Sequence, residues 1–210
     1  MSITFSLTLV FVIITVLASL YAWRQPDIKY KWMMNPYDVA RKREYYRFIT
    51  SGFIHEDGMH LLFNMMALYS FGVQMEKVFA QLYPGAGFTL FGTLYILGII
   101  VSDIPTFLKY RNVYNYNSLG ASGGVSAVVF AFILFYPQAQ LGFMFIPIPI
   151  PAFLFGALYM LYSVYMSKRG GDHINHDAHL WGALFGIVFS VIVYPPVVTL
   201  FMSQILGGSM

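Results

Sequence analysis

Long apolar runs separated by shorter polar stretches dominate the chain. Six of these runs approach the ~20 residues that a helix needs to cross the ~30 Å hydrocarbon core of a bilayer. They predict transmembrane helices at residues 2–23, 59–79, 85–101, 120–137, 151–166 and 177–194. The polar stretch 24–58 holds seven Lys/Arg and several aromatics, and predicts a structured loop beside the bundle. The pattern indicates an all-α, polytopic membrane protein whose single domain spans residues 1–210.

Composition excludes a soluble protein. Hydrophobic residues make up 58% of the chain and charged residues 10%, whereas a soluble domain carries roughly 25% charged residues. The mean hydropathy is +0.65, and the chain has no cysteine for disulfides or thiolate metal sites. The net charge of +3 includes no basic run, which favours membrane-flanking charges over nucleic-acid binding. The first apolar run lacks a charged leader and a cleavage site, so it is interpreted as a retained helix.

Few polar side chains fall within the predicted helices, and each is costly in lipid, so each indicates a functional role. His60 and Asn64 are four residues apart and therefore share one face of the second helix. Two interpretations remain open for this pair. The two side chains either line a polar cavity or form a structural hydrogen bond to a neighbouring helix.

Ser122 and His179 stand at the predicted starts of the fourth and sixth helices. The first turn of a helix offers unpaired N–H groups and a positive dipole end, which stabilise the oxyanion of an acyl transfer. Histidine can take and return a proton near neutral pH. Small residues at Ala178 and in the Gly182-x-x-x-Gly186 pair allow close helix packing in lipid. We therefore expect the imidazole to approach the serine hydroxyl.

Three short motifs occupy the second, fourth and sixth predicted helices. They are His60-Leu61-Leu62-Phe63-Asn64, Gly120-Ala121-Ser122-Gly123 and Ala178-His179-Leu180-Trp181-Gly182. In this order they resemble the H-x-x-x-N, G-x-S-G and A-H-x-x-G motifs of the rhomboid family of intramembrane serine proteases. The resemblance extends over residues 46–186 and includes Tyr46-Arg47, which is similar to the family's Trp-Arg element, and His55, where the family often has another histidine.

The resemblance implies a six-helix bundle with a Ser–His dyad and no catalytic Asp. Ser122 would attack the scissile carbonyl and His179 would take its proton. The oxyanion would be held by the Ser122 backbone N–H, His60 and Asn64. Supporting roles fall to Gly120, Gly123, Gly182 and Arg47. No metal or cofactor is implied, and the expected partners are single-pass transmembrane substrates and the lipid bilayer.

One position departs from the family pattern. Four residues after the nucleophile, the family usually has an aromatic side chain that packs on the catalytic histidine. Here that position is Ser126. The imidazole of His179 must therefore be held in another way.

The family resemblance and the charge distribution predict opposite orientations in the membrane. The family resemblance implies a multi-pass protein of the bacterial inner (cell) membrane, with its active site facing outward. Eleven of the 12 Lys/Arg lie in the loops after the first, third and fifth helices, which the positive-inside rule places in the cytoplasm. The predicted active site lies on that same side. We follow the family placement, because the first loop is expected to be a folded element.

Two other functions compete with a protease. A rhomboid-like pseudoprotease would bind membrane proteins without cleaving them, but both dyad residues and both oxyanion side chains are present. A transporter or channel could use the same polar residues as a path, but the sequence has no paired mid-helix acids and no inverted repeat.

Two histidine clusters look like metal sites at first sight. His55 and His60 flank Glu56, but they are five residues apart, whereas the zinc motif H-E-x-x-H needs four. His173, His176 and His179 are spaced by three, which permits a metal site on a helix. The preceding Lys-Arg-Gly-Gly run favours a solvated loop instead.

Overall fold

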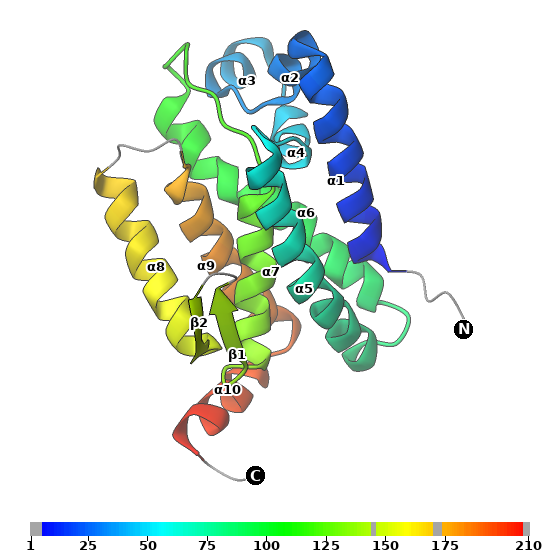
Figure 1. The fold of residues 1–210 in the computed structure, drawn as a ribbon, viewed down its shortest axis with the longest axis vertical. Coiled ribbons are helices and arrows are strands. Elements are labelled where there is room, and N and C mark those ends of the chain that lie inside the picture. The colour runs from blue at the N-terminus through cyan, green and yellow to red at the C-terminus, as the bar shows by residue number, and fades with distance from the viewer. Residues whose placement is uncertain (1–5, 144–145, 170–173, 208–210) are drawn as a thin grey trace.

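The computed structural model describes residues 6–143, 146–169 and 174–207. Long helices surround a central short one, α7 (Ser122–Phe135), as Figure 1 shows. The surrounding helices are α1 (Leu7–Arg24), α5 (Gly58–Leu82), α6 (Gly87–Tyr110), α8 (Ala152–Arg169) and α9 (His176–Val193). In Figure 1, α1 and α8 lie at opposite edges of the bundle.

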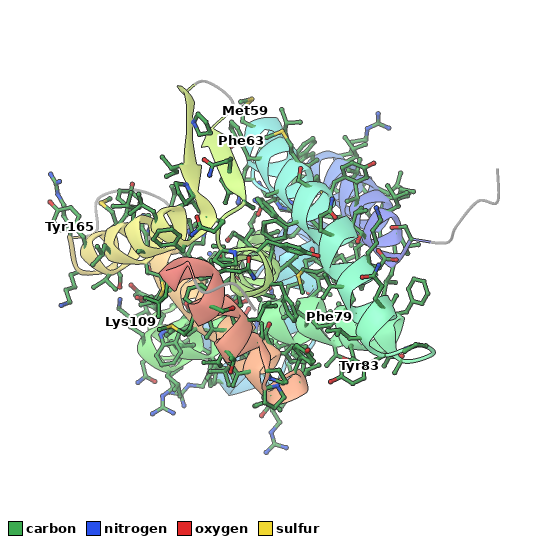
Figure 2. All side chains as sticks on the ribbon, turned by 90° about the horizontal axis from the view of Figure 1, so that it is seen from below. Met59, Phe63, Phe79, Tyr83, Lys109 and Tyr165 are labelled. Carbon is green, nitrogen blue, oxygen red and sulfur yellow. The ribbon has the colours of Figure 1, made fainter. Side chains whose placement is uncertain are left out.

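The central helix α7 is apolar on every face, which is typical of a helix buried on all sides. Twelve of its 14 residues are buried. Phe79 of α5, labelled in Figure 2, is fully buried, and its ring lies 6.3 Å from that of Phe135 on α7. A helix of 14 residues spans only about 21 Å. The chain that leads into α7 therefore descends from the end of the longer α6 into the bundle (Figure 1).

Three of the described helices are long and apolar enough to cross a membrane. They are Leu7–Arg24, Gly87–Tyr110 and His176–Val193. α7 and α10 (Val197–Leu206) are apolar but shorter. The prediction of a helical membrane protein is confirmed, whereas length and composition support three of the six expected spans. The shortness of α7 explains part of that difference, because a helix enclosed by protein has no need to match the lipid thickness.

The third predicted helix continues further than its apolar run. We expected it to end at Val101, with a loop over residues 103–119, but α6 extends to Tyr110. Asp103 is buried within this helix, and its Oδ2 accepts a hydrogen bond from Ser51 Oγ at 3.2 Å. Pro105 also lies inside α6, where neighbouring helices make such an interruption tolerable. Polar residues that find protein partners therefore extended the helix.

The Pro-rich stretch before the fifth predicted helix is a strand. β2 (Ile146–Pro151) pairs antiparallel with β1 (Gln140–Phe143) in a two-stranded hairpin. Proline suits extended backbone and the edge of a sheet, where its lack of an N–H costs no hydrogen bond between strands. The hairpin connects α7 to α8 at the end of α7 opposite Ser122.

The first loop folds into short helices, α2 (Pro26–Trp32), α3 (Pro36–Lys42) and α4 (Arg47–Thr50), followed by the 3-10 turn η1 (Ser51–Phe53). Arg47 lies buried at their centre. Its Nη1 donates to the carbonyl oxygens of Tyr30 and Met33, both at 2.7 Å, and its Nε donates to Glu44 Oε2 at 2.6 Å. Arg47 therefore stabilises the folded loop through these hydrogen bonds.

A buried carboxylate attaches α1 to the bundle. Glu76 of α5 accepts hydrogen bonds from the N–H groups of Leu7 and Thr8 at 2.7 and 3.0 Å, and from the hydroxyls of Ser6 and Thr8 at 3.0 and 2.7 Å. A negative charge at a helix N-terminus is favourable because it meets unpaired N–H groups and the positive dipole end. Glu76 thus has a structural role.

Candidate active site

The backbone before Ser122 has an unusual conformation. Gly120 has a φ of +123°, which only glycine adopts readily. A Cβ at this position would also lie 2.6 Å from Cε1 of His60. The N–H of Gly120 donates to the carbonyl of Ser51 at 2.9 Å. Glycine is therefore required here both for the turn into α7 and for the close approach of His60.

His55 supports the same turn. Its Nε2 accepts a hydrogen bond from the N–H of Ala121 at 3.2 Å, and its Nδ1 lies 3.2 Å from Ser19 Oγ. Burial lowers the pKa of His55 to about 3, so the ring is neutral near pH 7. Since Nε2 accepts, the proton sits on Nδ1 and is donated to Ser19. His55 thereby links α1 to the residue that precedes Ser122.

The first turn of α7 has the donors that an oxyanion needs. Its N-cap, Ala121, has no side-chain oxygen to accept from the N–H groups that follow. The first N–H groups of a helix have no partner within the helix itself. The imidazole of His60 lies against Gly120, and Asn64 Nδ2 donates to the His60 carbonyl at 3.0 Å. An amide carries two N–H donors, so a second one remains for another acceptor.

The backbones of α7 and α9 touch. A Cβ at Gly182 would lie 2.2 Å from the carbonyl oxygen of Gly123, and one at Gly186 would lie 2.1 Å from that of Ala127. A Cβ at Gly123 would lie 3.5 Å from the carbonyl oxygen of Ala178. Ser122 directly precedes Gly123 and His179 directly follows Ala178. The structure therefore brings the segments that carry the two predicted catalytic residues into direct contact.

His179 contacts two rings. Tyr159 of α8 stacks on it with a centroid distance of 6.0 Å and an interplanar angle of 18°. The ring of His176 meets it edge-on at 5.8 Å. The neighbouring Asp177 binds elsewhere, to Lys109 Nζ at 2.9 Å and to the hydroxyl of Ser167. Sequence reasoning missed Tyr159, because nothing in the local pattern distinguishes it from the other 15 tyrosines.

A small polar cavity of about 20 Å³ lies beside the nucleophile, lined by Ser51, Ser102, Asp103, Ser118, Ser122 and Asn175, among others. That volume is enough for one water molecule. A second polar cavity of about 310 Å³ also has Ser118 and Asn175 in its lining, next to the first residues of α9. Among the described residues, the side chain of Ser122 has no hydrogen-bond partner.

The histidine clusters show no metal arrangement within the residues that the structure describes. No group of three or more His, Cys, Asp or Glu gathers there. The rings of His55 and His60 lie 4.9 Å apart, but Glu56 between them pairs with Lys29 at 2.8 Å. The three-histidine hypothesis includes His173, which lies outside the described residues.

Comparison with known families decides the relationship. A model of the rhomboid domain matches residues 42–196, which is more than half of the chain. The chain belongs to the rhomboid family. This match includes all three motifs and the contact between α7 and α9.

The individual relatives named here share 30% or less of their aligned residues with this chain. RHOMBOID-like protein 12, mitochondrial, of Arabidopsis thaliana is 30% identical over 167 residues, covering 73% of this chain and 49% of the relative. Human presenilin-associated rhomboid-like protein, mitochondrial, is 28% identical over 145 residues, covering 66% and 35%. Rhomboid protease AarA of Providencia stuartii is 23% identical over 174 residues, covering 75% and 59%. The chain thus spans between 35% and 59% of the length of these three relatives.

The relatives bear on the expected location. The protein is a membrane protein with apolar helices. Several relatives are named mitochondrial, which does not fit the expected bacterial inner membrane, while the Providencia stuartii protein is bacterial. The comparisons support the membrane and not that compartment.

Proposed function

We propose that this rhomboid-family protein is an intramembrane serine endopeptidase that hydrolyses peptide bonds in or near transmembrane segments. The observation that carries the proposal is the backbone contact between Gly123 and Gly182. This contact holds the segments bearing Ser122 and His179 together at the start of two helices, beside a cavity large enough for water. Nucleophile, base, oxyanion donors and water are the four parts that hydrolytic acyl transfer requires.

The proposed reaction has two halves. Ser122 Oγ attacks the carbonyl carbon while His179 takes its proton, and the oxyanion forms near the Ser122 N–H, His60 and Asn64. His179 then protonates the leaving amine, and the C–N bond breaks to leave an acyl-enzyme. In the second half, His179 takes a proton from water, which attacks the ester. The acid is released when His179 returns the proton to Ser122 Oγ.

Asn64→Ala tests the oxyanion role of this amide. If Asn64 donates to the developing oxyanion, its removal should lower kcat by about 10²-fold with little change in KM. Gln74→Ala is the matched control, because it removes an exposed amide from the same helix. Both rates are measured on one transmembrane substrate. Equal activity of the two variants would exclude Asn64 from the oxyanion site.

The remaining expectations belong to the same proposal. We propose that residues 1–210 form one membrane domain in which α1, α5, α6, α7, α8 and α9 are the six spans. The substrates are single-pass membrane proteins that unwind near the cut site, because a stable helix buries its peptide bonds. The site faces outward in this proposal. A reporter fused to the C-terminus tests that orientation against the charge bias of the loops.

The proposed function is tested with purified protein and a model transmembrane substrate. We expect cleavage by the wild-type protein, and covalent labelling by a fluorophosphonate that disappears in Ser122→Ala. Binding of the substrate without cleavage or labelling would identify a pseudoprotease. Labelling that persists in Ser122→Ala would overturn the assignment of the nucleophile.

A further inference from the structure

A general base must be held in one orientation by another group if it is to serve a serine nucleophile. In many hydrolases a carboxylate does this, but the nearest acid in the sequence, Asp177, is bound to Lys109 and Ser167. Stacking on Tyr159 is the most parallel ring contact that His179 makes within the described residues. Tyr159 is therefore the group to consider for this role.

Tyr159 is itself fixed at both ends. Its hydroxyl lies 3.0 Å from Ser126 Oγ, a buried group on α7 one helical turn after Ser122. Its ring packs against Phe130 of α7 at 5.8 Å and Phe155 of α8 at 6.0 Å between centroids. A buried tyrosine hydroxyl requires a partner, and Ser126 provides one. One side chain thus connects α8, the nucleophile helix and the imidazole.

We propose that Tyr159 is a positioning residue for His179, and that its hydrogen bond to Ser126 fixes the ring in the stacking position. The proposal rests on the proposed function. It explains how the imidazole is held although residue 126 is not aromatic. A small serine at position 126 leaves room on α7 for the tyrosine ring from α8 and supplies the acceptor or donor for its hydroxyl.

The arrangement has a specific consequence for catalysis. Stacking restricts rotation of the imidazole about its side-chain bonds, and it does so from α8, a helix that carries no reacting group. The hydrogen bond to Ser126 fixes the position of Tyr159 relative to α7. Because α7 also carries Ser122, the base and the nucleophile are then held relative to the same helix. Loss of the ring should therefore lower the rate of the chemical step and leave substrate binding unchanged.

His176 does not replace Tyr159 in this role. Its ring meets His179 edge-on, at an interplanar angle of 74°, and packs edge-on against Tyr162 as well. The ring of Tyr159 lies nearly parallel to the imidazole, at 18°, whereas the ring of His176 crosses it steeply. Removal of His176 should therefore have a smaller effect than removal of Tyr159.

The test compares variants of the 210-residue chain in one detergent with one transmembrane substrate. Tyr159→Leu should lower kcat by about 10²-fold at unchanged KM, since a displacement on the order of 1 Å at a catalytic group has that effect. Tyr159→Phe retains the ring and should recover most of that loss. Tyr165→Leu is the matched control: this tyrosine lies on the same helix at the periphery of the bundle and is 56% exposed (Figure 2). It should retain the wild-type rate.

A double-mutant cycle tests the hydrogen bond itself. Ser126→Ala and Tyr159→Phe each remove one partner, so each should lower kcat by a similar factor of several-fold, and the double variant should be no slower than either single one. Independent losses that multiply in the double variant would overturn the link between Ser126 and Tyr159. Thermal unfolding of each variant separates loss of folding from loss of positioning.

The outcomes distinguish this inference from the proposed function. If the wild-type protein neither cleaves nor binds the fluorophosphonate, the protease itself is wrong. If the wild-type protein cleaves and folded Tyr159→Leu matches Tyr165→Leu in kcat, the positioning role is wrong and the protease stands. An equal rise in KM for Tyr159→Leu and Tyr159→Phe at unchanged kcat would make Tyr159 a substrate contact and overturn the role as well.

Discussion

His179→Ala should lower the kcat of purified protein by roughly 10⁴–10⁶-fold, the range found when a serine hydrolase loses its base. A serine hydroxyl is a weak nucleophile unless a base removes its proton as it attacks. Water cannot substitute for that base, because it is a far weaker base than imidazole. The measurement is cleavage of a transmembrane substrate under saturating conditions.

A Ser122–His179 dyad also predicts how the effects of the two substitutions combine. Ser122→Ala, His179→Ala and the double variant should all have the same residual rate, because residues that act as a unit do not contribute additively. His176→Ala is the matched control, since it removes a neighbouring imidazole that meets His179 edge-on. If His176→Ala lowered kcat as much as His179→Ala, the assignment of His179 as the base would be wrong.

The positions of the candidate site residues could be predicted because lipid makes polar residues conspicuous. Ser122 and His179 stand out in apolar segments, and the glycines beside them indicate where helices approach. The structure places Gly123 and Gly182 in contact, as that reasoning requires. The sequence puts His60 at the start of a helix, and its imidazole lies against Gly120 in the structure.

Other parts of the fold depend on partners that no local pattern reveals. α6 continues past its apolar run because Asp103 meets Ser51, 52 residues away in the sequence. Tyr159 contacts His179 across a segment that includes residues outside the described part of the chain. The β1–β2 hairpin was also not predicted, because the alternating Ile and Pro of residues 146–151 indicated an interfacial stretch. For α6 and Tyr159 the deciding contacts join residues far apart in the sequence.

Gly182→Ala should have the second largest effect, although it adds only one methyl group. That methyl would lie 2.2 Å from the Gly123 carbonyl oxygen and 3.0 Å from the Gly123 Cα, and neither backbone atom can rotate away. The helices must separate by roughly 1 Å to relieve the contact, and a displacement of that size at a catalytic group costs about 10²-fold in rate. Overpacking also destabilises a folded protein by about 1–3 kcal/mol.

Gly92→Ala provides the matched control. It makes the same change inside α6, where the nearest atom is Cδ2 of the flexible Leu7 side chain at 3.1 Å. That side chain can move, so the control should keep the wild-type cleavage rate and thermal midpoint. Gly182→Ala should lower both. The comparison separates the α7–α9 contact from the general effect of replacing a helical glycine. Wild-type cleavage by folded Gly182→Ala would mean that Ser122 and His179 do not depend on this contact, which is the observation that carries the protease proposal.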